Sequence, residues 1–246
     1  MPEDRLYGIH PVREALTGDK KLEKILIRKG MDSPVALEIT ELARQQNVSV
    51  QYVPQEKLNH MAGNRNHQGL VAVLAQLDYV SLEEAAQAAS AKSKFPTVLL
   101  LDGVSDVRNF GAIARTCECA GVGALILPAK GGAAVNQDAI KTSAGALLRI
   151  PTCKVPNLKT ALYYLKESGY TIIGTAAGLE HSIYDADFCR PTAIVMGAEG
   201  KGISDSVMPL CDQLVSIPQL GGIGSLNVSA ATAVVLFEAV RQRINK

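Results

Sequence analysis

From residue 96 onward the chain alternates apolar segments with helical ones, and this pattern constrains the fold more than any other feature. Strands are expected over residues 97–101, 124–127, 150–153, 171–176, 193–196 and 214–217. Helices are expected over residues 110–120, 136–147, 158–167 and 227–243, with a short helix from residue 204. Strands without polar alternation are buried on both faces, so the pattern predicts an α/β fold whose parallel sheet is covered by helices on both sides.

The first 76 residues predict a separate small α/β unit. Its pattern indicates helices over residues 11–16 and 35–46 and strands over residues 24–28, 48–53 and 70–74. Residues 77–95 are alanine-rich and polar, and Ser81 and Glu84 have the spacing of a capping box. We therefore expect one domain over residues 1–76, a linker with a short helix over residues 77–95, and a second domain over residues 96–246.

Composition is that of an ordinary folded chain. Of the 246 residues, 47% are hydrophobic and 20% are charged, which argues against intrinsic disorder. No apolar run approaches the roughly 20 residues of a membrane span, and the N-terminus lacks a signal pattern, so we expect a soluble cytoplasmic protein without a membrane partner. Five cysteines, two of them in a C-x-C pair, indicate structural thiols, with neither a disulfide framework nor a metal site.

Net charge gives no overall signal for nucleic-acid binding. The chain has 25 basic and 24 acidic residues, a formal charge of +1. RNA binding would therefore depend on a local patch. The one concentration of basic residues, interrupted by Glu23, comprises Lys20, Lys21, Lys24, Arg28 and Lys29. A solvated helix-to-strand edge is the commoner explanation of such a cluster.

Ligands of a parallel sheet bind at the carboxyl ends of its strands, so the loops after the strands carry the functional information. Several standard motifs are missing there: G-x-G-x-x-G after a strand, G-x-x-x-x-G-K-[ST], G-x-S-x-G and H-E-x-x-H. Their absence disfavours a dinucleotide dehydrogenase, a P-loop NTPase, an α/β-hydrolase and a zinc protease.

Three other clusters follow the strands. The first places Asn109 at a helix start, where asparagine is commonly a cap, and Arg115 two turns later in an otherwise apolar helix. An arginine facing the sheet would need a partner, so Arg115 is harder to explain structurally. The second cluster sets Glu199 among glycines 197, 200 and 202, which permit close approach of a ligand. That carboxylate is either a turn cap or a functional group.

The third cluster joins the strand ending at residue 217 to the last helix through three glycines. Ser225 and Asn227 stand at the N-terminus of that helix, where exposed N–H groups suit an anionic ligand group. A plain N-cap is the alternative explanation of Ser225.

Together the three clusters resemble the SpoU family of RNA ribose 2'-O-methyltransferases, whose motifs are N-x-G-x-x-x-R, G-x-E-G-x-G and I-P-M-x-G-x-x-x-S-L-N-V-S. The order and spacing of the motifs are intact over residues 97–243, with Gln219 in place of the usual methionine. The resemblance implies a C-terminal α/β domain with a trefoil knot, S-adenosylmethionine bound in that knot, and an active site formed in a homodimer.

A second resemblance covers residues 5–75. The segments 7–16 and 67–69 are similar to the ribosomal-protein-L30-like α/β RNA-binding domain that precedes many of these catalytic domains, and relatives that methylate transfer RNA generally lack it. The resemblance implies methylation of a guanosine in 23S ribosomal RNA. Transfer RNA, another ribosomal site, and a non-catalytic ribosome-assembly factor are the alternatives. His10 and His67 are expected either to contact RNA or to lie in the core.

The resemblance also assigns roles to individual residues. Arg115 is the residue it marks as catalytic, and because a guanidinium stays protonated we expect it to polarise the 2'-hydroxyl and hold the adjacent phosphate. Glu199 would orient polar groups, while Asn109, Ser225 and Asn227 would align the ribose and Arg115. No metal is needed. The donor would be enclosed by Thr175, Ala176, Gly178, Met196, Gly197, Gly200, Ile217, Gln219, Ser225 and Leu226.

Overall fold

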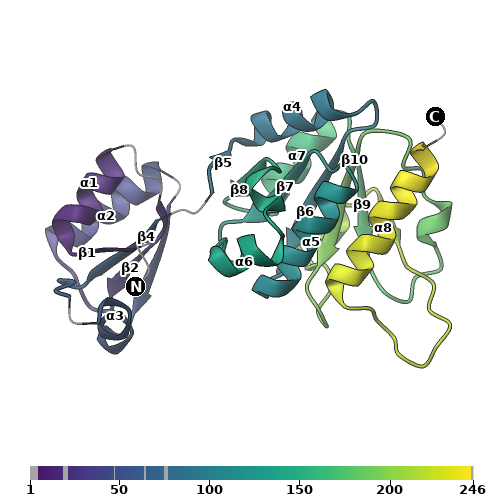
Figure 1. Cartoon of the computed structure of the whole chain (residues 1–246). Coiled ribbons are helices and arrows are strands. Elements are labelled where there is room, and N and C mark those ends of the chain that lie inside the picture. Colours follow the sequence, from purple (N-terminus) through teal and green to yellow (C-terminus); the bar gives the residue numbers. More distant parts are fainter. Residues whose placement is uncertain (1–4, 19–21, 47, 64, 75–76, 245) are drawn as a thin grey trace. The chain divides into compact units, whose positions relative to one another are not determined.

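The computed structural model describes residues 5–18, 22–46, 48–63, 65–74, 77–244 and 246. The chain forms two compact units, Met1–Asp78 and Tyr79–Lys246, which we call the N-terminal unit and the C-terminal unit. Each has its own sheet (Figure 1). Within the described residues, no helix is long and apolar enough to cross a membrane.

The N-terminal unit is built on a mixed four-stranded sheet of order β1-β4-β2-β3. β2 pairs in parallel with β3 and antiparallel with β4, which also pairs antiparallel with β1. The strands are β1 (Arg5–Tyr7), β2 (Leu22–Arg28), β3 (Ser49–Val53) and β4 (Leu70–Leu74). The three-residue β1 was not predicted, because a segment so short carries no periodicity.

Helices cover both faces of this sheet. α1 (Ile9–Thr17) and α2 (Pro34–Gln45) pack on the face that carries Ile25 and Ile27. α3 (Gln55–Ala62) packs on the other face against Leu26. The sequence did not predict α3, since Leu58 and Ala62 are its only buried residues.

The C-terminal unit contains a seven-stranded sheet of order β11-β9-β10-β6-β7-β8-β5 in which every pair is parallel. The parallel sheet, predicted from apolar segments without alternating polar residues, is thus confirmed. Its strands are β5 (Tyr79–Val80), β6 (Thr97–Asp102), β7 (Ala124–Pro128), β8 (Thr152–Val155), β9 (Thr171–Thr175), β10 (Thr192–Gly197) and β11 (Gln213–Val215).

Helices cover both faces of the parallel sheet, as predicted. α4 (Leu82–Lys92) and α7 (Leu158–Glu167) pack on the face that carries Val98 and Leu100. Leu99 and Leu101 alternate to the opposite face and are equally buried. That side is covered by α5 (Val107–Cys119), which contacts α6 (Gln137–Thr142) and α8 (Val228–Arg243) (Figure 1).

The predicted linker is wrong from Tyr79 onward, because this segment belongs to the C-terminal unit. β5 pairs in parallel with β8, and α4 buries Ala85, Ala86 and Ala89. A Cβ placed on Gly123 would lie 2.3 Å from the Ala89 Cα, so the alanines allow a helix to approach the sheet very closely. The capping box is confirmed: Glu84 N donates to Ser81 Oγ at 3.1 Å, and Ser81 N donates to the Glu84 carboxylate at 2.7 Å.

The helix predicted over residues 136–147 is interrupted. α6 ends at Thr142, and a 3-10 turn, η1 (Ala146–Leu148), follows. Ala144 (φ 50°) and Gly145 (φ 81°) adopt left-handed backbone conformations, which an α-helix cannot continue through.

The path after β11 carries the chain from one edge of the sheet back across its carboxyl end. β11 pairs with β9 at that edge, whereas α8 packs on α5 and contacts β10. Residues 216–227 connect the two. The trefoil knot implied by the family resemblance stays a prediction.

Candidate active site at the carboxyl ends of the strands

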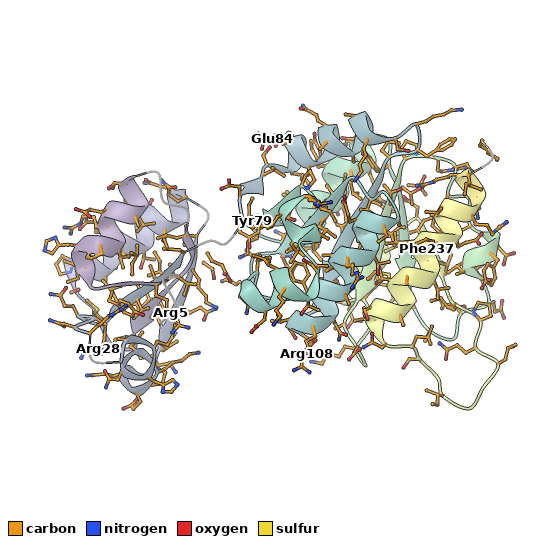
Figure 2. All side chains as sticks on the ribbon, in the orientation of Figure 1. Arg5, Arg28, Tyr79, Glu84, Arg108 and Phe237 are labelled. Carbon is orange, nitrogen blue, oxygen red and sulfur yellow. The ribbon has the colours of Figure 1, made fainter. Side chains whose placement is uncertain are left out.

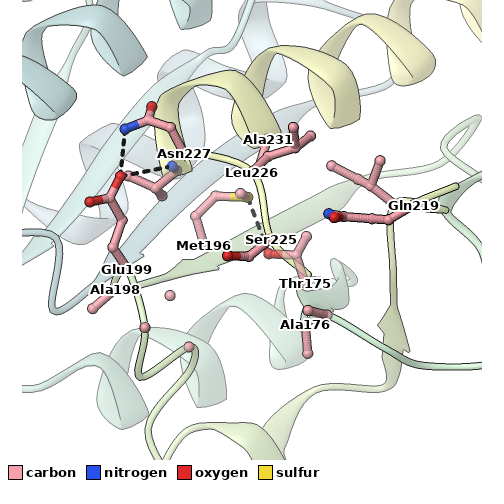
Figure 3. Close-up of a pocket in the computed structure, with 16 residues that line it drawn as sticks. Thr175, Ala176, Met196, Ala198, Glu199, Gln219, Ser225, Leu226, Asn227 and Ala231 are labelled. Atoms are coloured by element: carbon pink, nitrogen blue, oxygen red, sulfur yellow. Dashed lines mark hydrogen bonds between the residues drawn. The ribbon is translucent and has the colours of Figure 1, made fainter. Parts of the chain in front are cut away.

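A cavity of about 430 Å³ lies at the carboxyl ends of β9 and β10 and beside the first turn of α8 (Figure 3). The segment that follows β11 forms part of its wall. Its wall is formed by Thr175, Ala176, Ala177, Met196, Gly197, Ala198, Glu199, Gly200, Gly202, Ile217, Gln219, Ser225, Leu226, Asn227, Val228 and Ala231.

The glycines of the second motif shape one wall. A Cβ on Gly197 would lie 2.1 Å from the carbonyl carbon of Gly202, so only glycine allows the two backbone segments to meet. Ala198 and Gly202 exchange two backbone hydrogen bonds of 3.0 and 2.8 Å, with Gly200 in a left-handed conformation (φ 77°) between them. This closed loop holds Glu199 in one place.

Three side chains from the three motifs meet at one end of the cavity. Glu199 Oε1 accepts hydrogen bonds from Asn109 Nδ2 (3.3 Å), from Asn227 Nδ2, and from the Val228 backbone N–H (3.3 Å). Asn227 Nδ2 also donates to Asn109 Oδ1 at 3.0 Å. We call Asn109, Glu199 and Asn227 the amide–carboxylate cluster. It unites three of the five side chains predicted to be catalytic.

Both asparagines are positioned by helix starts. Asp106 caps α5 by accepting from Asn109 N at 2.8 Å, so Asn109 is not the cap and its carboxamide can reach Glu199. Asn227 caps α8, because its Oδ1 accepts from the backbone N–H groups of Ser229 (3.0 Å) and Ala230 (3.4 Å). Ser225 is therefore not the cap; it is exposed and lines the cavity.

Arg115 does not face the sheet, so its charge needs no buried partner. α5 buries Phe110, Ile113 and Ala114, whereas Arg115 is exposed and does not line the cavity. It lies six residues after Asn109, roughly 9 Å further along the helix axis. Within the part of the chain that the structure describes, no hydrogen bond or ion pair involves Arg115.

A second exposed arginine, Arg108, was missed by the sequence analysis. It lies in the first turn of α5, seven residues before Arg115 and therefore on the same stripe of the helix (Figure 2). The neighbouring helix α8 exposes 49% of Phe237 (Figure 2).

Nine of the ten residues predicted to bind the donor line the cavity. The exception is Gly178, whose φ of 74° makes it a turn residue beyond the wall. Five further wall residues were not assigned: Ala177, Ala198, Gly202, Val228 and Ala231. Ala198 and Gly202 lie inside the second motif, and the last two lie on the first turn of α8, so proximity to the motifs was the available signal.

The predicted RNA patch of the N-terminal unit is only partly described. Lys20 and Lys21 lie outside the described residues. Lys24 is half-buried on β2, whereas Arg28 and Lys29 are exposed at its end. The Arg28 guanidinium donates to Gln55 Oε1 at 3.5 Å.

The two candidate histidines differ. His10 is exposed on α1. His67 Nδ1 accepts from the Gly69 N–H at 3.0 Å, so Nε2 carries the proton and donates to Asn59 Oδ1 at 2.8 Å. Both nitrogens of His67 thus hold the turn before β4 together, and the structure gives this residue a structural task.

Three of the five cysteines have the environment of structural thiols. Burial raises the pKa of Cys153 and that of Cys211 to about 11, and it also raises the pKa of Cys117. These three thiols therefore stay protonated at neutral pH. Among the described residues, no group of histidine, cysteine, aspartate or glutamate side chains could hold a metal ion.

Two families match the chain. Residues 96–237 match the SpoU rRNA methylase family, and residues 5–80 match the family described as RNA 2'-O ribose methyltransferase substrate binding. The chain belongs to the SpoU rRNA methylase family. It is a SpoU/TrmH-type RNA 2'-O-methyltransferase in which a catalytic domain follows a substrate-binding domain.

The similarity of this SpoU protein to its relatives extends over nearly its whole length. An uncharacterised tRNA/rRNA methyltransferase of Synechocystis is 37% identical over 98% of the chain, which spans 63% of that relative's length. A Staphylococcus epidermidis protein, named as a TrmH family tRNA/rRNA methyltransferase, is 36% identical over 99% of this chain and 97% of its own.

Solved structures agree with the fold of the SpoU protein. The SpoU methyltransferase AviRb from Streptomyces viridochromogenes, in complex with the cofactor AdoMet, is 25% identical with a TM-score of 0.62 over 98% of this chain and 91% of its own. A TrmH/SpoU tRNA modifying enzyme of A. aeolicus is 30% identical with a TM-score of 0.57 over 67% of this chain and 83% of its own.

Proposed function

We propose that this SpoU-family protein uses S-adenosylmethionine to methylate the ribose 2'-hydroxyl of a guanosine in 23S ribosomal RNA, and that it does so as a homodimer. The observation that carries the proposal is the cavity at the strand ends, with the amide–carboxylate cluster at one end. Each of the three family motifs contributes one side chain to this cluster.

The cavity fits the donor. Its volume of about 430 Å³ is in the range of small-molecule sites, and small side chains and glycine backbone form most of its wall. The bound donor supplies a methyl group on a sulfonium centre. Gly197 and Gly200 admit the donor close to the backbone, while Ala176, Ile217 and Leu226 offer apolar contact.

Glu199 acts as a positioning residue. All the described hydrogen bonds to its carboxylate end on Oε1, so Glu199 orients Asn109 and Asn227 through a single oxygen. A carboxylate aimed at the sulfonium would stabilise the charged ground state more than the transition state, in which that charge is being lost. Orientation of the two carboxamides toward the ribose is the role that favours transfer.

Arg115 completes the site from a second copy of the chain. Its guanidinium is exposed on α5 and lies outside the cavity of its own copy, which supports a role across a dimer interface. The half-exposed Phe237 on the adjacent α8 supports an interface on this side. There Arg115 polarises the 2'-hydroxyl and holds the neighbouring phosphate, because a guanidinium remains protonated and cannot serve as the base.

The assignment to ribosomal RNA is supported by the N-terminal unit. Residues 5–80 match a substrate-binding domain, whereas the tRNA modifying enzyme of A. aeolicus aligns with only 67% of the chain. A second domain adds surface for contact with a large folded RNA, and its exposed Arg28 and Lys29 are available for phosphate contacts.

Mapping of ribose methylation tests the proposal. Cells lacking the protein should lose one 2'-O-methylguanosine in 23S RNA, and the purified protein should restore it with S-adenosylmethionine. Loss of a methyl group in transfer RNA alone would assign the enzyme to that substrate. Unchanged methylation in both RNAs, with no donor binding by calorimetry, would indicate a non-catalytic assembly factor and contradict the proposal.

A further inference from the structure

The side chain of Gln219 stands in the donor cavity. It lines the wall, is exposed, and reaches into the cavity from the end opposite Glu199 (Figure 3). Within the described part of the chain, no hydrogen bond involves its carboxamide. The SpoU motif usually has methionine at this position, so Gln219 places two donor hydrogens and one acceptor oxygen where a thioether is usual.

The surroundings of Gln219 suit a flat heteroaromatic ring. Ala176, Leu226 and Ala231 lie around it in the cavity (Figure 3). The hydroxyl of Thr175 is already engaged, since Oγ1 donates to the Val195 carbonyl at 3.1 Å. Small apolar side chains can pack against the two faces of a ring, but they form no hydrogen bonds with its polar edge. The polar atoms of that edge therefore need another hydrogen-bonding group.

The opposite end of the cavity suits charged groups. There lie the carboxamides and the carboxylate of the amide–carboxylate cluster, which already accepts the first N–H groups of α8. A donor with an adenine ring at one end and an amino acid moiety at the other therefore has one favoured orientation. Its ring lies at the Gln219 end.

We infer that the Gln219 carboxamide recognises the adenine edge of the methyl donor by pairing with its exocyclic amine and an adjacent ring nitrogen. The inference rests on the proposed function, because it assumes that S-adenosylmethionine occupies this cavity. A carboxamide matches adenine by accepting from the amine and donating to the ring nitrogen. A methionine at position 219 would supply apolar contact with the ring and no donor.

A binding cycle tests this contact without measuring methyl transfer. Calorimetry would compare S-adenosylhomocysteine with its analogue in which an unsubstituted purine replaces adenine. The wild-type protein should favour the adenine compound, and this preference should fall by about tenfold in Gln219→Leu and Gln219→Met, as expected for one lost hydrogen bond. Gln213→Leu, an exposed glutamine of β11 outside the cavity wall, is the matched control and should keep the full preference.

The outcomes separate this inference from the proposed function. An equal preference for adenine in the wild type and in both Gln219 variants would overturn the inference and leave donor binding intact. A raised KM for RNA with an unchanged preference would assign Gln219 to the RNA base and overturn it as well. If the wild type bound neither compound, the proposed function would fail, and the inference with it.

Discussion

The two units of this protein differ in how their strands are directed, and the difference determines where chemistry can occur. In the N-terminal unit, β1 and β2 both run antiparallel to β4, so polar loop residues are divided between the two ends of the sheet. In the C-terminal unit all pairs are parallel, and every strand therefore ends at the same edge. The loops with Asn109, Glu199 and Asn227 converge there.

A parallel sheet thus brings functional side chains together at one edge. The small mixed sheet instead divides its loops between two ends. The N-terminal unit carries exposed cations such as Arg28 and Lys29 on a strand end, as expected of a unit that holds RNA. The C-terminal unit holds the cavity. Variants in the N-terminal unit should therefore affect RNA binding, and variants in the C-terminal unit should affect donor binding or methyl transfer.

The largest effect is expected at Arg115. Arg115→Ala should lower single-turnover methyl transfer by about 10³-fold or more, because it removes the charge that stabilises the developing oxyanion. Donor affinity and thermal unfolding should stay near wild type, since Arg115 is exposed and outside the cavity wall. Arg115→Lys should rescue little, because a point charge cannot reproduce a planar two-pronged contact. Near-normal transfer by Arg115→Ala would contradict the proposed mechanism.

Mixed dimers test whether Arg115 acts on the partner copy. Arg115→Ala and Glu199→Ala chains refolded together should be more active than either variant alone. A mixed dimer then contains one complete site, so an equal mixture should recover roughly a quarter of the wild-type sites. No recovery, with mixed dimers demonstrated by mass, would place Arg115 and Glu199 in the same copy's site.

A smaller effect, roughly 10²-fold on transfer, is expected for Asn227→Asp. The aspartate keeps the oxygen that caps α8 but loses the Nδ2 donor and sets a second carboxylate against Glu199. The melting temperature should therefore change little while transfer falls. Combined with Glu199→Ala, the loss should be far from additive, because both changes remove the same hydrogen bond. Additive losses would mean that the two side chains act independently.

Removal of the N-terminal unit should weaken RNA binding by roughly 10- to 100-fold and flatten its salt dependence, since phosphate contacts release counterions. A chain that starts at Tyr79 should fold and bind the donor with unchanged affinity. A chain that starts at Pro96 should lose much of its stability, because it lacks β5 and the buried alanines of α4. Equal melting temperatures for the two truncations would contradict this boundary.

The smallest effects are expected in the basic patch. Lys24→Gln, Arg28→Gln and Lys29→Gln should each weaken RNA binding a few-fold and lower the salt slope by about one. Lys159→Gln, an exposed lysine on α7 in the other unit, is the control and should leave both quantities unchanged. If Lys159→Gln matched the patch variants, the patch would be an ordinary solvated edge.

The class of the fold and the functional loops could be predicted from local patterns in the sequence. β4 and α7 have the predicted bounds. A short apolar run predicts the strand and an amphipathic repeat predicts the helix, and both signals are contained in the segment itself. The second and third motifs located seven of the nine wall residues that were correctly expected, since each motif is a short segment placed at a strand end, and the other two, Thr175 and Ala176, follow β9.

Features that depend on residues distant in the sequence could be seen in the folded chain alone. Segment 81–92 has the composition of a linker, yet Ala85, Ala86 and Ala89 are buried, because small side chains allow a helix to pack closely on a sheet. Arg115 has apolar neighbours in the sequence, yet it is exposed. Burial of the Phe110 and Ile113 side chains sets the orientation of α5 about its own axis, and Arg115 lies on the opposite, exposed side. Asn109 meets Glu199 and Asn227 across 90 and 118 residues. Local periodicity carries no information about such pairs, since the order of the strands in the sheet sets them.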